Sequence, residues 1–107
     1  MSFPETDINP NAEFGVRISG DSMEPEYYDG DIIQIEPCNV INSGELGLFI
    51  LNGDALFKQY INDTENRRVR LHSFNGEYED RIIKSNEYLH VFGRVVGKLR
   101  VSKIKVH

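Results

Sequence analysis

The stretch that decides the fold is Glu45–Ile61, with the sequence ELGLFILNGDALFKQYI. Two apolar runs, Leu46–Leu51 and Ala55–Ile61, lie on either side of the residues Asn-Gly-Asp. Because Asn and Gly tolerate positive φ, this arrangement predicts a β-hairpin with a primed turn. The second run contains Lys58, which is the only lysine in residues 1–83. A charged side chain inside such a strand requires an explanation.

Short strands are expected along the rest of the chain as well. Apolar and polar residues alternate with a period of two, and Gly, Pro, Asn and Asp separate the alternating segments. The further strands are expected over residues 13–19, 31–37, 69–74, 81–85 and 88–101. No segment sustains the apolar spacing of three and four residues that an amphipathic helix needs. The sequence therefore predicts an all-β fold.

Length and composition indicate one globular domain. The chain has 107 residues, of which 39% are hydrophobic and 27% charged. We expect no transmembrane helix, because no apolar run reaches 18 residues, and no signal peptide, because Met1–Asn11 lacks a basic and an apolar region. Cys38 is the only cysteine, so an internal disulfide is excluded, and this fits a reducing cytoplasm.

Charge is distributed unevenly. Residues 1–58 contain 11 acidic and two basic side chains, whereas residues 59–107 contain 10 basic and six acidic ones. The segment Arg94–Lys105 has five bases and no acid. Its bases alternate with apolar residues, which favours a sheet edge or a subunit contact over a phosphate-binding patch.

Metal and cofactor sites are not indicated. The potential soft ligands are scattered: His72, His90, His107 and Cys38. Asp29 and Asp31 surround Gly30 ahead of a predicted strand, a pattern typical of a turn rather than a cation site. A glycine-rich phosphate loop is lacking, and no histidine lies near a motif that would suggest a Ser-His-Asp triad.

Ser22 is the one candidate nucleophile. It lies in SGDSMEPEYYDGD, residues 19–31, after a predicted strand and on a tight Gly-Asp-Ser turn. A serine in this setting is ordinarily a turn residue. Alternation places Lys58 on the same face of its strand as Leu56 and Tyr60. If that face points inward, desolvation lowers the lysine pKa, and a neutral amine can accept a proton from a serine hydroxyl. The alternative is a Lys58 side chain that extends to water from an edge strand.

Several segments in order resemble one known family. They are FGVRISGDSMEPEYYDGDIIQIEP, GELG, LFKQY, VRLHSFNGEYEDRII and VFGRVVGKL. From about Phe14 to Leu99 the chain resembles the C-terminal domain of LexA-type and lambda-type phage repressors, a self-cleaving Ser–Lys peptidase family that includes the UmuD proteins. The resemblance implies a compact, strongly curved β structure, shared with type I signal peptidases. It also implies that Ser22 is the nucleophile, that Lys58 is the general base, and that backbone N–H groups of Asp21 and Ser22 stabilise the oxyanion.

The resemblance further implies a regulatory role. Residues 1–12 would be a flexible linker remnant and residues 13–107 a peptidase and dimerisation domain. The expected partners are a second copy of the chain, DNA through an N-terminal helix-turn-helix domain that this chain lacks, and a recombinase filament that triggers cleavage. The family cleaves an Ala-Gly or Cys-Gly bond, and neither dipeptide occurs here. Two alternatives stay open: a non-catalytic oligomerisation or sensing module, and a processed UmuD-like polymerase accessory protein.

Overall fold

The fold is all-β, as the sequence predicts. The computed structural model describes residues 8–100, within which no helix occurs, so none there could cross a membrane. The seven strands are β1 (Phe14–Arg17), β2 (Ile32–Pro37), β3 (Leu46–Leu51), β4 (Asp54–Asp63), β5 (Arg68–His72), β6 (Arg81–Ile82) and β7 (Leu89–Leu99).

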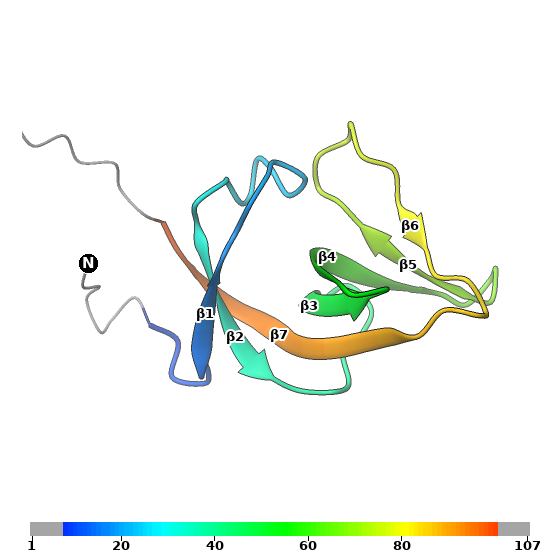
Figure 1. Cartoon of the computed structure of the whole chain (residues 1–107), viewed down its shortest axis with the longest axis horizontal. Coiled ribbons are helices and arrows are strands. Elements are labelled where there is room, and N and C mark those ends of the chain that lie inside the picture. Colours follow the sequence, from blue (N-terminus) through cyan, green and yellow to red (C-terminus); the bar gives the residue numbers. More distant parts are fainter. Residues whose placement is uncertain (1–7, 101–107) are drawn as a thin grey trace, which may run out of the picture.

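All seven strands belong to one curled antiparallel sheet with the order β1-β2-β7-β3-β4-β5-β6. In Figure 1, β7 extends from the end of the molecule that contains β1 and β2 to the end that contains β3 to β6. The last strand of the chain therefore joins the two halves of the sheet. The predicted hairpin Glu45–Ile61 is the β3–β4 pair in the second half.

Two apolar clusters form the core, one on each face of the central strands. The first contains Ile33, Ile35 and Leu48, with Val16, Ile18, Tyr27, Phe57 and Val95 packed against it. The second contains Ile41, Phe49 and Leu71, with Leu56, Tyr60, Ile83, Leu89 and Val91 packed against it. Leu48 and Phe49 are neighbours in β3, so their side chains point to opposite faces. Because both faces of β3 are covered, its sequence is a continuous apolar run rather than an alternating one.

Two β-bulges in β7 allow this strand to contribute side chains to both clusters. The register with β3 skips Phe92, and the register with β2 skips Val96. An extra residue bends a strand and reverses the face of the residues beyond it. Val91 and Val95 are four residues apart, yet the bulge at Phe92 places them in different clusters.

Gly93 lies at the crowded centre of the sheet and gives the first testable prediction. It is buried between β2 and β3, and a Cβ there would lie 2.4 Å from Cγ2 of Ile35 and 2.9 Å from the backbone oxygen of Glu36. We expect Gly93→Ala to lower the free energy of unfolding by about 1–3 kcal/mol, because the backbone must shift to admit the methyl group. Urea denaturation measures this loss, with Gly76→Ala as the control, since nothing lies within 4 Å of a Cβ at that position. Equal stability of the two variants would contradict the crowding.

For the basic C-terminal segment, the prediction of a sheet edge is wrong in its described part, and the alternative of a subunit contact stays a prediction. β7 is bonded on both sides, to β2 and to β3. Its bases contact the domain itself: Arg94 forms ion pairs with Glu36 and Glu45, and Lys98 donates to the carbonyl of Glu26. The remainder of that segment, with Lys103 and Lys105, lies outside the described residues, and so does His107.

Residues 1–7 of the predicted linker also lie outside the described residues. Within the rest of the linker, the backbone N–H of Asn9 donates to Gln34 in β2 and its side-chain amide donates to the carbonyl of Val96 in β7.

Candidate active site

The β3–β4 hairpin carries Lys58 in β4, between β3 and β5 in the sheet. Asn52 and Gly53 form the turn with φ of 51° and 86°, the left-handed conformation that the Asn-Gly pair predicts. Lys58 pairs with Gly47 of β3, and its neighbour Phe57 packs into the first cluster. Leu56 and Tyr60 pack into the second cluster. Alternation therefore holds through β4, and Lys58 shares the face of Leu56 and Tyr60.

Ser22 lies in a loop that backbone hydrogen bonds close at its base. Between β1 and β2, the backbone N–H of Ile18 donates to Asp31 at 2.8 Å, and the N–H of Gly30 donates back to Ile18 at 2.9 Å. Within the loop, the Asp29 carboxylate accepts the N–H of Gly20 at 2.8 Å. The Asp-Gly-Asp segment therefore forms a turn, as its sequence predicts.

Met23 anchors the next turn of this loop. Its side chain is 2% exposed, whereas Asp21 on the other side of Ser22 is exposed. The Ser22 side chain itself is half-buried. The chain direction around Ser22 is thus fixed by one buried apolar side chain and by the hydrogen bonds at the base of the loop.

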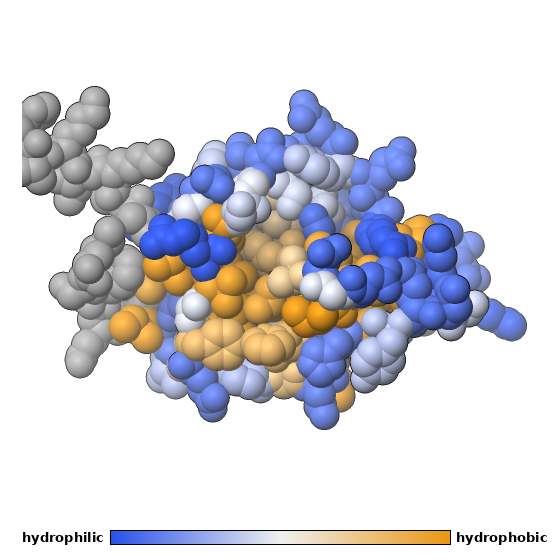
Figure 2. Space-filling view, viewed as in Figure 1, coloured by the Kyte–Doolittle hydropathy of each residue, from blue (hydrophilic) through white to orange (hydrophobic). Residues whose placement is uncertain are grey.

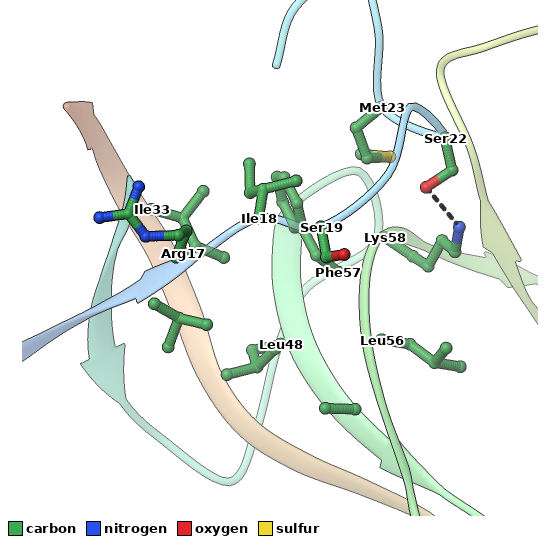
Figure 3. A pocket seen from close by; sticks show the side chains of 12 residues that line it. Arg17, Ile18, Ser19, Ser22, Met23, Ile33, Leu48, Leu56, Phe57 and Lys58 are labelled. Atoms are coloured by element: carbon green, nitrogen blue, oxygen red, sulfur yellow. Dashed lines mark hydrogen bonds between the residues drawn. The ribbon is translucent and has the colours of Figure 1, made fainter. Parts of the chain in front are cut away.

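Ser22 and Lys58, 36 residues apart in the sequence, meet in space. Nζ of Lys58 lies 3.0 Å from Oγ of Ser22, the contact drawn as a dashed line in Figure 3. Nζ also lies 2.8 Å from Oγ of Ser73. Lys58 is half-buried, and burial lowers the pKa of its ammonium group because desolvation disfavours the charged form. This pair can transfer a proton from the hydroxyl to the amine.

An apolar groove of about 340 Å³ opens beside this pair. Ile18, Leu48, Leu56 and Phe57 line it together with Met23, as Figure 3 shows. In Figure 2, apolar side chains gather between β1 and the β3–β4 hairpin, and hydrophilic ones surround them. The groove could hold an extended segment with apolar side chains next to the Ser22 hydroxyl.

The other candidate residues lie in separate environments. His72 lies with Nδ1 2.7 Å from Oδ1 of Asp80, and the ring of His90 lies beside Tyr88. Cys38 is a free thiol in the loop after β2. Within residues 8–100, no group of three or more His, Cys, Asp and Glu side chains could hold a metal ion.

Three residues beside the pair were not singled out by the sequence. Ser73 is 2% exposed and contacts Lys58, while Asn75 and Tyr78 bond the Ser22 turn. For Ser73 a signal was present, since it continues the alternation of Val69 and Leu71 on the inward face of β5. For Asn75 and Tyr78 the sequence NGEYED indicated only a turn. Their contacts depend on how this loop folds back over a segment more than 50 residues earlier.

The fold and this pair define a class of protein. A strongly curved antiparallel sheet, with a serine hydroxyl and a half-buried lysine amine at an apolar groove, has the architecture of an all-β peptidase-like domain. The family model described as Peptidase S24-like matches residues 1–96, so the chain belongs to the Peptidase S24-like family. This match, together with the relatives described next, confirms the resemblance to LexA-type domains.

Curated relatives of the chain are LexA repressors. The one from Carboxydothermus hydrogenoformans is 33% identical over 99 residues, which are 92% of this chain and 45% of that protein. The one from Clostridium acetobutylicum is 31% identical over 93 residues, 86% of this chain and 43% of that protein. The one from Leptospira interrogans serovar Lai is 30% identical over 89 residues, 82% of this chain and 41% of that protein. The chain thus spans less than half the length of these relatives.

Proposed function

We propose that this chain is the self-cleaving, dimer-forming domain of a LexA-like transcriptional repressor, with Ser22 as nucleophile and Lys58 as general base. The observation that carries the proposal is the 3.0 Å separation between Oγ of Ser22 and Nζ of Lys58. Burial of the lysine supports it, because an amine with a lowered pKa is neutral in a larger fraction of molecules. The alternative of a non-catalytic module gains no support from an amine held at this distance.

The proposed reaction proceeds in two steps. The neutral amine of Lys58 takes the hydroxyl proton of Ser22 while Oγ attacks the carbonyl carbon of a peptide bond. The tetrahedral intermediate then collapses, the protonated amine of Lys58 gives its proton to the leaving amine, and an acyl-enzyme remains. Water hydrolyses this ester with Lys58 again acting as the base. Backbone N–H groups of Asp21 and Ser22 are the proposed donors to the oxyanion.

The proposed substrate is a linker upstream of this domain in a longer repressor. An Ala-Gly or Cys-Gly bond there would enter the apolar groove beside Ser22. Cleavage would separate an N-terminal DNA-binding domain from this domain. DNA affinity would fall because the two DNA-binding domains of a dimer would no longer be linked and would bind independently. A second copy of the chain and a recombinase filament as the trigger are the proposed partners. An UmuD-like accessory role shares the same chemistry and would differ in the segment released.

The pH dependence of Ser22 reactivity tests the chemistry on this chain directly. A fluorophosphonate probe reacts when an activated serine oxygen attacks phosphorus and fluoride leaves. We expect one probe per chain, mapped to Ser22 by peptide mass spectrometry. The labelling rate should rise by about tenfold per pH unit as Lys58 loses its proton and should level off below the pH at which an ordinary lysine titrates, since burial lowers the pKa of Lys58.

Two outcomes would contradict the proposal. One is a label distributed over several serines, or located on Ser19, which lines the same groove. The other is a rate that does not change with pH. Ser85→Ala, at an exposed position in the turn after β6 and away from the groove, is the matched control and should react at the rate of the unaltered chain. Release of the amine product from a peptide that contains Ala-Gly, assayed at the pH of the plateau, then tests peptide-bond cleavage itself.

A further inference from the structure

The segment between β5 and β6 contacts both members of the Ser22–Lys58 pair. Ser73 directly follows β5, and its hydroxyl lies 2.8 Å from the Lys58 amine. Asn75 bonds the other member: its backbone N–H donates to the carbonyl of Ser22 at 3.0 Å, and its side-chain amide donates to the carbonyl of Asp21 at 3.1 Å. We call residues 73–78 the clamp segment.

Ser73 has the position needed to orient the Lys58 amine. A neutral amine has two hydrogens and one lone pair, and only the lone pair can accept the Ser22 proton. The amine also rotates freely about its last bond unless a partner fixes it. Ser73 Oγ can accept one N–H, which directs the lone pair away from Ser73 and toward Ser22. Because Ser73 is 2% exposed, water does not readily replace its hydroxyl as a partner.

Tyr78 closes the same segment over the pair. Its hydroxyl donates to the carboxylate of Asp21, the residue before Ser22, and Nζ of Lys58 lies 5.9 Å from the centre of its ring. The hydrogen bond to Asp21 raises the pKa of Tyr78, so the phenol keeps its proton to a higher pH than an ordinary tyrosine does. The turn that carries Ser22 is therefore tied to the clamp segment at both backbone and side-chain groups.

We propose that the clamp segment positions the pair: Ser73 orients the Lys58 amine, and Asn75 and Tyr78 hold the Ser22 turn against it. These are positioning residues, since each acts through Ser22 or Lys58 and not on the reacting bond. The inference rests on the proposed function of the pair. It predicts that losses appear in the rate of bond formation and not in probe binding, because the groove that binds the probe is left unchanged.

The test follows fluorophosphonate labelling of each variant at its own plateau pH, at which the rate no longer changes with pH. We expect Ser73→Ala to lower the maximal labelling rate constant by about tenfold, with unchanged probe affinity and an unchanged final extent of labelling. Ser73→Thr keeps the hydroxyl and should restore most of the rate. Tyr78→Phe, at a position that is 45% exposed, should fold without difficulty and lower the same rate constant by about threefold.

The outcomes separate this inference from the proposed function. The positioning role alone would be overturned if the unaltered chain is labelled and both Ser73→Ala and Tyr78→Phe react at rates within twofold of its rate. An unaltered chain that takes up no probe at any pH would instead remove the proposed function. A smaller final extent of labelling with an unchanged rate constant would indicate partial unfolding, and it would overturn positioning as the cause of the loss.

Discussion

Lys58→Met should slow fluorophosphonate labelling of Ser22 by about 1,000-fold at the plateau pH, because general-base assistance by a positioned side chain contributes on the order of 10²–10⁴-fold. Methionine is unbranched like lysine and keeps much of the apolar contact of its carbon chain, so the strand should stay in place. The remaining slow reaction should lose its steep dependence on pH, since the group that titrates is gone. Second-order rate constants measured from neutral to alkaline pH check both expectations.

Three further variants make this result specific. Lys58→Arg should be as slow as Lys58→Met, because a guanidinium keeps its proton and cannot accept another. Ser22→Ala should take up no probe. Lys84→Met, which removes an exposed lysine from the turn after β6, is the matched control and should label at the original rate. A Lys58→Met chain that labels within tenfold of the unaltered chain would exclude Lys58 as the base.

Much of the fold could be predicted from local patterns. The Asn-Gly turn and the apolar runs beside it predict the β3–β4 hairpin, and the structure pairs these runs with Leu46 opposite Gln59. The position of β7 could not be predicted this way. Its alternation of basic and apolar residues is also typical of an edge strand, but two bulges let one strand serve both clusters. Bulges depend on contacts with neighbouring strands, which a period of two does not reveal.

The candidate site, like the fold, could be predicted from the sequence only in part. Ser22 and Lys58 each stand out locally, one on a tight turn and the other as a lone lysine in an apolar strand, and the structure brings them within 3.0 Å. In the clamp segment, Asn75 and Tyr78 show no such local signal. Ser73 could be placed on an inward face, yet its partner is set by how β4 and β5 pair, with Gln59 opposite His72. Polar contacts between distant segments are decided by the packed sheet, so the sequence alone does not identify them.

Phe49→Ala should lower the free energy of unfolding by about 3–5 kcal/mol, the usual cost of removing a buried phenylalanine from a core. Phe49 is fully buried in the second cluster, and its ring stacks on Tyr60 with the centroids 6.2 Å apart. A domain of this size is typically stable by about 5–15 kcal/mol, so the loss is a large part of the total. The midpoint of urea unfolding measures it, provided that the slope of the transition stays constant.

The contrast with Phe92→Ala shows whether this loss arises from burial. Phe92 lies at the bulge in β7, is 43% exposed, and meets Phe14 edge-to-face at 5.6 Å, so its removal should cost about 1 kcal/mol or less. Phe49 also packs against Leu56 and Tyr60, the two residues that share a strand face with Lys58. The milder variant Phe49→Leu should therefore stay folded yet label Ser22 more slowly, as the support beneath β4 loosens. Equal unfolding midpoints for Phe49→Ala and Phe92→Ala would show that the second cluster does not hold this half of the sheet together.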